Sequence, residues 1–285
     1  MAGRLQGKVL LITGAGSGLG REVALLAAEE GAKVVVTDKI EARVGPVVAA
    51  IVAKGGEAAG RKADVRVESE VEAAAAFAVD TFGTLNVVHA NAGVTVPGQG
   101  SVPLEETTLE SWHTVNDVNL TGVFLTIKHA ARAMKQAGGG SIVVTSSAAS
   151  LASYPGFGIY AAGKAGVNGL VRAAAFELGK YGIRTNAICP AHGMSVNFML
   201  PPDAPVAGVS YEEAAGPWDP SVAVMPLRIG RPPSLSDNAW PVIFLASDES
   251  AYMSGGFFPT ADGGQFARTS IPFPDNWSLD QQTAS

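Results

Sequence analysis

The sequence has little that would cross-link the chain or hold it in a membrane. It contains one cysteine, Cys189, among 285 residues, so it forms no internal disulfide. That thiol stands in the apolar stretch Asn186–Pro190, which indicates a core residue rather than a nucleophile. No apolar run reaches the roughly 18 residues of a membrane-spanning helix, and the run after Arg4 and Lys8 is too short for a signal peptide. We therefore expect a soluble, cytoplasmic protein in a reducing compartment, with no membrane partner.

Charge is also scarce. Charged residues make up 16% of the chain, and the net charge is −6 with a pI near 5.3. Such a protein has no basic field to hold a phosphate backbone, so nucleic acid is excluded as a partner. By contrast, 47% of the residues are hydrophobic and the mean hydropathy is +0.21, which predicts a large core and excludes overall disorder.

The order of short and long hydrophobic segments predicts the fold. Short β-branched runs alternate with longer segments of helical period, the pattern of βαβ units and a parallel sheet. We expect strands at Lys8–Thr13, Lys33–Thr37, Ala58–Ala63, Asn86–Ala90, Ser141–Ser146, Arg184–Ile188 and Phe257–Thr260. We expect helices at Leu19–Glu30, Glu41–Lys54, Glu68–Phe82, Leu109–Gln136, Gly158–Lys180 and Ser234–Ala246. The prediction is an α/β fold with a doubly wound, seven-stranded parallel sheet of Rossmann type, forming a single domain over residues 1–268.

Two segments interrupt this alternation. Residues 194–231 form a proline-rich connection with apolar side chains such as Phe198 and Trp218, which would be costly to leave in water. A connection of this length within a compact domain predicts a substrate lid. The tail, residues 269–285, carries Trp277 among prolines and is expected either to dock on a neighbouring subunit or to fray.

Glycines follow the first expected strand directly. The stretch Thr13-Gly-Ala-Gly-Ser-Gly-Leu-Gly20 places Gly14, Gly18 and Gly20 at the spacing G-x-x-x-G-x-G, just before a helix. Small residues there let the backbone turn tightly and offer the N–H groups of a helix N-terminus to a pyrophosphate. The motif, in this strand-to-helix context, predicts a dinucleotide-binding loop.

A carboxylate ends the second expected strand. Asp38 stands where a dinucleotide fold contacts the adenosine ribose, so it would accept hydrogen bonds from both hydroxyls and repel a 2′-phosphate. This favours NAD over NADP. Lys39 and Arg43 are nearby cations that would partly offset the repulsion.

Tyrosine, lysine and serine form the candidate catalytic group. Tyr160-Ala-Ala-Gly-Lys164 is a Y-x-x-x-K match, and residues four apart on a helix share a face. Ser147 follows the strand Ser141–Ser146, at the edge where open α/β sheets bind ligands.

These motifs, in this order, resemble the short-chain dehydrogenase/reductase family from Lys8 to Gly264. The resemblance also rests on Asp64-Val65, Asn91-Ala-Gly93, Asn119-Leu-Thr-Gly122 and Asp262-Gly-Gly264. It implies a catalytic tetrad of Asn119, Ser147, Tyr160 and Lys164, with no metal. The residues expected at the cofactor are Gly14, Ser17, Gly18, Leu19, Gly20, Asp38, Asp64, Val65, Asn91, Ala92, Gly93, Tyr160, Lys164, Pro190, Gly193 and Ser195.

The chain departs from the family pattern at two places. Ala90 stands where members often have a first Asn, and Ala191 stands where Gly often follows Pro190. By register, Gly193 and Ser195 should lie near the nicotinamide carboxamide, whereas His192 is interpreted as a structural hydrogen-bonding residue. Position 17 is often Arg or Lys in NADP-preferring members; here it is Ser17, in agreement with Asp38.

The resemblance implies reversible hydride transfer. The ordinary pKa of a tyrosine is about 10, so Lys164 and an oxidised nicotinamide ring would be needed to stabilise the phenolate of Tyr160. Ser147 would bind the alcohol oxygen, and Asn119 would fix a water. We expect NAD-dependent oxidation of a secondary alcohol, on a bulky, weakly polar cyclic, aromatic or steroid-like substrate. One alternative is an NADPH-dependent ketoreductase of the 3-oxoacyl type, which only the cations Lys39 and Arg43 favour. Another is a non-enzymatic NAD-binding sensor, which would be expected to have lost part of the tetrad.

The resemblance also implies assembly. Family members commonly pair the helices expected here at Leu109–Gln136 and Gly158–Lys180 across two-fold axes, which predicts a homotetramer. The second helix is rich in small residues that would permit close approach: Ala161, Ala162, Gly163, Ala165, Gly166, Gly169, Ala173, Ala174 and Ala175. The alternative is that these alanines simply pack on the sheet.

Overall fold

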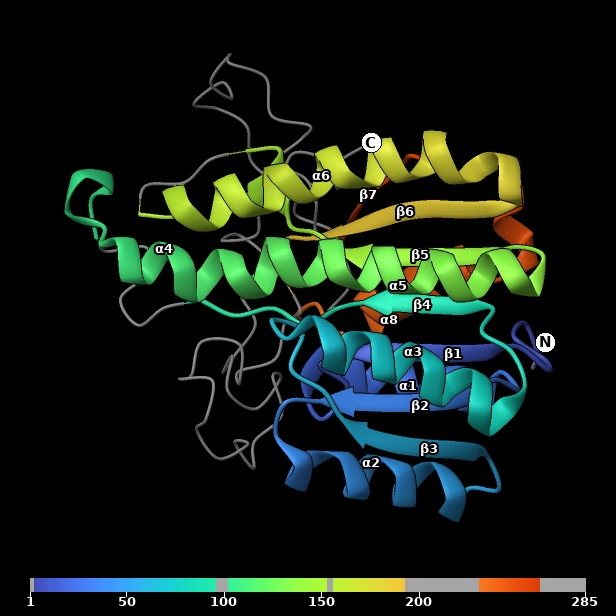
Figure 1. The fold of residues 1–285 in the computed structure, drawn as a ribbon. Coiled ribbons are helices and arrows are strands. Elements are labelled where there is room, and N and C mark those ends of the chain that lie inside the picture. Colours follow the sequence, from blue (N-terminus) through green and yellow to red (C-terminus); the bar gives the residue numbers. More distant parts are fainter. Residues whose placement is uncertain (1–2, 96–101, 153–155, 193–230, 262–285) are drawn as a thin grey trace, which may run out of the picture.

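A computed structural model describes residues 3–95, 102–152, 156–192 and 231–261. These contain one seven-stranded parallel sheet in the order β3-β2-β1-β4-β5-β6-β7 (Figure 1). The strands are β1 Val9–Thr13, β2 Lys33–Asp38, β3 Glu57–Lys62, β4 Val87–Ala90, β5 Gly140–Thr145, β6 Ile183–Pro190 and β7 Phe257–Thr260. The larger helices are α1 Gly18–Glu29, α2 Glu41–Ala53, α3 Glu68–Phe82, α4 Leu109–Asn116, α5 Gly122–Ala137, α6 Gly158–Leu178 and α8 Leu235–Ala246. The predicted Rossmann-type fold is confirmed. The lid assigned to 194–231, apart from Arg231, and the tail assigned to 269–285 lie outside the described residues.

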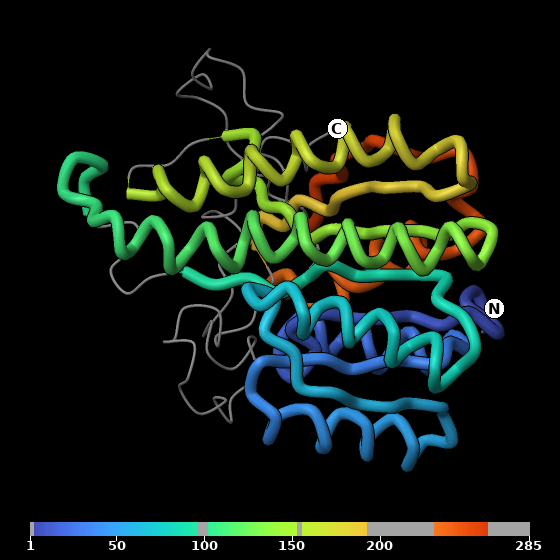
Figure 2. The backbone as a smooth tube through the Cα atoms, in the orientation of Figure 1, coloured from blue at the N-terminus to red at the C-terminus, as the bar shows by residue number. Residues whose placement is uncertain are grey.

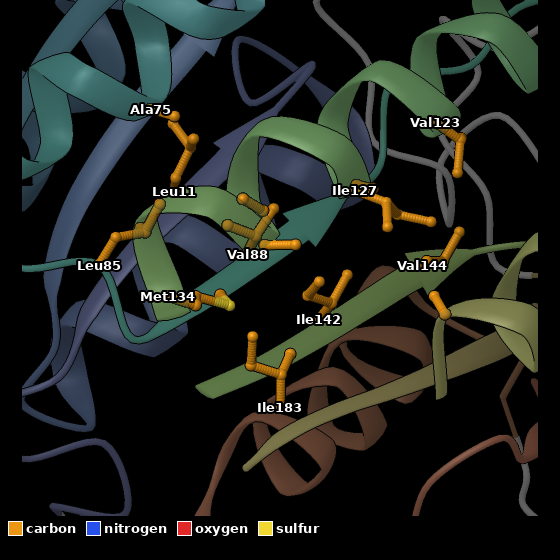
Figure 3. Packing of buried hydrophobic residues seen from close by; sticks show 14 of the residues in the cluster. Leu11, Ala75, Leu85, Val88, Val123, Ile127, Met134, Ile142, Val144 and Ile183 are labelled. Atoms are coloured by element: carbon orange, nitrogen blue, oxygen red, sulfur yellow. The ribbon is translucent and has the colours of Figure 1, made fainter. Parts of the chain in front are cut away.

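The sheet is buried on both faces. Leu11 of β1 and Val88 of β4 pack with α3, α5 and α6 on one face, the cluster that Figure 3 shows from close by. Leu10 and Ile12 of β1 face the opposite way, into a second cluster with α1, α2 and α8. Because successive side chains of a strand alternate between faces, a parallel strand covered by helices on both sides needs a continuous apolar run, as β1 has.

The helix expected over Leu109–Gln136 is not a single α-helix. A π-helical turn at Asp117–Thr121 separates α4 from α5, although the three segments follow one another along one rod (Figure 2). Within this turn, the Asn119 amide is bound to the backbone of Val94, outside the helix. A Cβ on Gly122, the first residue of α5, would lie 2.6 Å from Val65 Cγ2, so the close approach at this point requires glycine.

The strand order places the candidate site. Neighbouring β1 and β4 lead to α1 and to α4–α5, and α1 and α5 pack on opposite faces of the sheet. Ligands of open α/β sheets bind at such a switch point, beyond the carboxyl ends of the strands. Gly14, Asp38, Asn91 and Ser147 all follow or end strands at this edge. Among the described helices, none is long and apolar enough to cross a membrane.

The start of α8 has a titratable contact that affects stability. Hydrogen bonds from Arg231, at 2.6 and 2.8 Å, and from the Ser234 N–H, at 2.7 Å, lower the pKa of Asp237 to about 2. A carboxyl whose pKa is depressed on folding stabilises the protein above its unfolded pKa, ordinarily 3.8, and this contribution is lost as the pH falls through the folded value.

We therefore expect Asp237→Asn to be less stable than the wild type at pH 6, with a difference that shrinks between about pH 4 and about pH 2. Urea denaturation of both proteins across this range measures it. A stability difference that stays constant down to pH 2 would contradict the assignment.

Candidate active site

The glycine loop connects β1 to α1 at the switch point. Gly14 has φ +65° and Gly18 has φ +53°, backbone conformations that favour glycine. A Cβ on Gly14 would lie 2.9 Å from Ala92 Cα, and one on Gly20 would lie 2.4 Å from the Gly14 carbonyl oxygen. The glycines are therefore required by close backbone approach, and the loop leaves space that side chains would fill.

A chain of buried hydrogen bonds supports this loop from below. Asn91 Nδ2 donates to the carbonyls of Thr13 at 3.1 Å and Gly14 at 3.3 Å, so its Oδ1 points the other way and accepts from Thr145 Oγ1 at 3.2 Å. The Thr145 hydroxyl has only one proton to give, so its oxygen accepts from His89 Nε2, 2.8 Å away. The network therefore assigns the Nε2–H tautomer to His89.

Burial keeps His89 neutral. The ring is fully buried and its Nδ1 has no hydrogen-bond partner among the described residues, which fits the bare acceptor nitrogen of that tautomer. Desolvation lowers the pKa of His89 to about 3. The sequence offered one signal that was not used: a histidine inside an otherwise apolar strand has to find a buried partner.

Asp38 is held rigidly at the far end of the loop. Its Oδ2 accepts from the Gly16 N–H at 3.1 Å and its Oδ1 from the Ile40 N–H at 2.9 Å, and the side chain is buried. A Cβ on Gly16 would lie 2.7 Å from Asp38 Oδ2 and 2.5 Å from Arg43 Cβ. Gly16, which the motif spacing did not single out, thus allows the carboxylate to sit against the loop.

Asp64 and Val65 line the same cleft one strand further out. The Asp64 carboxylate binds Arg66, whose Nε lies 3.0 Å from Oδ1, and this contact is the main cause of the lowered pKa of Asp64. Lys39 and Arg43 also line this part of the cleft, so cations surround both carboxylates.

The catalytic candidates meet at the end of β5. Lys164 Nζ donates to the Thr145 carbonyl at 2.8 Å and lies 5.7 Å from the centre of the Tyr160 ring. Burial raises the pKa of Tyr160 to about 12, against a hydrogen bond from Ser147 that lowers it. Burial lowers the pKa of Lys164 to about 8. A phenol, an ammonium and a hydroxyl thus share one corner, in which the ammonium and the hydroxyl favour the ionised form of the phenol.

Asn119 joins this group through the backbone. Its amide pairs with Val94, accepting from the N–H at 2.8 Å and donating to the carbonyl at 2.9 Å. Gly93 lies between Asn119 and Lys164, because a Cβ there would be 3.4 Å from Asn119 Oδ1 and 3.7 Å from Lys164 Nζ. The Asn119 side chain therefore fixes the loop after β4. The water that the family resemblance gave to Asn119 stays a prediction.

One cleft unites most of the predicted residues. It is lined by Gly14, Ser17, Gly18, Leu19, Asp38, Asp64, Val65, Asn91, Ala92, Gly93, Tyr160 and Lys164. The same cleft contains residues the sequence did not indicate: Ala63, Arg66, Val94, Thr114, Val118 and Thr145. Gly20 lies behind the loop, Ser147 contacts Tyr160, and Pro190 ends β6. Gly193, Ser195 and Asp262–Gly264 lie outside the described residues.

Ala191, the departure from the family pattern that follows β6, has ordinary backbone geometry. Among described residues other than glycine, only Ala261 has a positive φ, so Ala191 is not strained. The His192 carbonyl accepts from Asn238 Nδ2 at 2.8 Å and its N–H donates to the Ala261 carbonyl at 3.1 Å, which ties this segment to α8 and the end of β7.

The cleft fits a dinucleotide. The glycine loop leaves room at a helix N-terminus, a fixed carboxylate stands at the end of β2, and Tyr160 with Lys164 lies at the opposite end of the same cleft. The protein thus has a Rossmann-type fold with a cleft at the switch point and a buried corner of titratable side chains.

Comparison with known proteins specifies the family. A family model described as short chain dehydrogenase matches residues 8–197. The chain is 39% identical over 257 residues to a cyclohexanol dehydrogenase of Acinetobacter sp. (strain SE19), covering 90% of this chain and 94% of that protein. It is 37% identical over 256 residues to (+)-borneol dehydrogenase 2 of Salvia officinalis, covering 88% and 87%. The crystal structure of levodione reductase matches with a TM-score of 0.80 and 33% identity, covering 93% and 100%. The chain belongs to the short-chain dehydrogenase/reductase family.

The buried network generates a prediction that needs no substrate. Because burial lowers the pKa of His89 to about 3, its ring should stay neutral from about pH 5 to about pH 8, as the Nε2–H tautomer. Long-range ¹H–¹⁵N spectra of histidine-labelled protein report tautomer and charge, and His89→Gln identifies the signal by its loss. A His89 signal that titrates in this range would contradict the network.

Proposed function

We propose that this protein oxidises secondary alcohols to ketones with NAD, in a reversible reaction. One observation carries the proposal: Tyr160, Lys164 and Ser147 converge at one end of a cleft whose other end holds the carboxylate of Asp38. The comparisons support it, since two relatives are named as uncharacterised NAD-dependent oxidoreductases of Mycobacterium tuberculosis, each 37% identical over 276 residues and covering 92% of this chain and 97% of the relative.

Each residue has a defined part in this reaction. Ser147 donates a hydrogen bond to the alcohol oxygen, and Tyr160 removes the hydroxyl proton as a phenolate. Lys164, with its ammonium beside the ring, stabilises that phenolate and holds the nicotinamide ribose. NAD would supply the hydride acceptor for the carbinol carbon. The alcohol thus loses one proton to Tyr160 and one hydride, which leaves the ketone.

The relatives support a substrate class. We propose a cyclic, weakly polar alcohol, because the relatives include enzymes named for cyclohexanol, borneol and a chlorinated cyclohexadienediol. The alternative of an NADPH-dependent 3-oxoacyl ketoreductase has Lys39 and Arg43 in its favour, since both line the cleft. The non-enzymatic sensor is disfavoured because all four tetrad residues are present and gathered together.

Replacing the proposed base tests the chemistry. Tyr160→Phe should lower kcat for cyclohexanol oxidation by at least about 100-fold, the usual scale of general base catalysis, while the Kd for NAD changes less than about twofold. Tyr181→Phe, on a tyrosine at the molecular surface, is the matched control and should keep full activity. Activity of Tyr160→Phe above a few per cent of the wild type would remove Tyr160 from its role.

Cofactor choice tests the other end of the cleft. The wild type should prefer NAD over NADP by at least about tenfold in kcat/KM, about 1.4 kcal/mol, because Asp38 repels a 2′-phosphate. Asp38→Ala should narrow the ratio, and so should Gly16→Ala, whose methyl group would displace the carboxylate. Gly45→Ala, in α2 with open space around it, is the control and should leave the ratio unchanged. Equal efficiency with both cofactors in the wild type would overturn the assignment.

A further inference from the structure

Helix α6 carries a third buried polar residue on the face of Tyr160 and Lys164. Asn168 follows Lys164 by one helical turn and Tyr160 by two, so all three side chains lie along one side of the helix. Asn168 is buried, with 3% of its surface exposed, and the mechanism described above does not use it. A buried amide at this place needs partners, and those partners connect it to the catalytic serine.

Both ends of the Asn168 amide bind the segment that contains Ser147. Oδ1 accepts from Ser146 Oγ at 2.7 Å, and Nδ2 donates to Ser150 Oγ at 2.8 Å. Ser150 Oγ in turn donates to the Ser147 carbonyl at 2.5 Å. The amide thus spans the residue before Ser147 and the short 3₁₀ turn after it.

The hydrogen bonds of Asn168 bear on the distance between the Ser147 hydroxyl and the Tyr160 phenol. Tyr160 comes from α6, whereas Ser147 lies two residues beyond the end of β5. The last hydrogen bond to the sheet before Ser147 is the one from the Ser146 N–H to the Ile188 carbonyl, at 2.9 Å. The bond from Lys164 Nζ to the Thr145 carbonyl ties helix and strand end together before Ser147, and the Asn168 amide ties them on both sides of it. Within its own turn, Ser147 accepts from the N–H groups of Ala149 and Ser150. The Asn168 amide joins this turn to the helix that carries Tyr160.

We propose that Asn168 is a positioning residue for alcohol oxidation: its amide clamps Ser146 and Ser150 and so holds the Ser147 hydroxyl against Tyr160. This inference rests on the proposed function and extends it to a residue that contacts neither substrate nor cofactor. A leucine of similar size at position 168 would remove both hydrogen bonds, from the buried Ser146 hydroxyl and to the half-buried Ser150 hydroxyl. Small displacements of reacting groups have large effects on rate, because the reaction needs a near-attack geometry.

The pH dependence of kcat distinguishes a role of Asn168 in positioning Ser147 from a role in the stability of the fold alone. The charged or titratable groups that face Tyr160 are Lys164, from the same helix, and the Cys189 thiol of β6. The Ser147 hydrogen bond lowers the pKa of Tyr160 against the effect of burial. If Ser147 moves away, the pKa of Tyr160 rises further, and the rise of kcat with pH shifts to higher pH.

The experiment compares two asparagines of the same kind. Asn168→Leu is measured beside Asn186→Leu, because Asn186 is also buried and also uses both amide ends, accepting from Gly256 N–H at 3.0 Å and donating to the Met253 carbonyl at 2.7 Å. Asn168→Leu should lower kcat about tenfold or more, keep KM for NAD within about twofold, and move the pH profile to higher pH. Asn186→Leu should lower Tm but leave kcat and the pH profile as in the wild type.

A second variant covers the case in which Asn168→Leu does not fold. Ser150→Ala removes the partner of Asn168 Nδ2 and should also lower kcat and shift the pH profile; in the double variant, the Ser150→Ala change should add little. The proposal is overturned if both single variants keep kcat within about twofold and an unchanged pH profile, or if their effects simply multiply.

Failure of the proposed function would be visible separately. If the wild type oxidises no secondary alcohol, crystal structures of the wild type and of Asn168→Leu still test the clamp. A displacement of Ser147 from Tyr160 in the variant would support it, and an unchanged separation would overturn it.

Discussion

The two halves of the candidate active site meet at one residue, Thr145, and both depend on it. Its carbonyl holds the buried ammonium of Lys164, and its hydroxyl donates to Asn91 while accepting from His89. A buried charge needs a hydrogen-bonding partner. The Thr145 carbonyl can be that partner without a further loss of conformational entropy, because the sheet already holds the backbone of this strand in place. Helix α6, which carries Tyr160 and Lys164, and the glycine loop are therefore positioned from one residue.

The two halves of the sheet contribute different groups to the cleft. The β1–β3 side supplies the glycine loop and two carboxylates. Backbone N–H groups hold Asp38, whereas the Asp64 carboxylate is held mainly by the Arg66 side chain. The β4–β6 side supplies the groups that titrate, and burial moves their pKa values in opposite directions, Tyr160 upward and Lys164 downward. Each shift favours the neutral form of its group, so charge separation in this corner depends on the two residues stabilising each other.

The sequence was sufficient for the order of the elements and for the residues with motifs. Three local patterns could be recognised without knowledge of the fold: the apolar run of β1, the glycines after it and the tyrosine–lysine spacing on α6. Gly16, His89 and Asn168 were not predicted, because each matters through a partner that is distant in sequence or lies on another element. β6 also extends beyond its expected end, since Cys189 and Pro190 pair with Pro259 and Thr260 of β7.

The π-helical turn at Asp117–Thr121 changes how the apolar pattern of this rod should be interpreted. Val115, Asn119, Val123 and Ile127 are all buried, and they recur at every fourth position. On an unbroken α-helix, with 3.6 residues per turn, such a repeat drifts by about 40° each step, or about 120° over the three steps. One additional residue in a single wide turn removes about 100° of that drift. Buried residues at every fourth position of a long helical segment thus indicate a π-helical turn, which keeps one face of the rod aligned with the sheet.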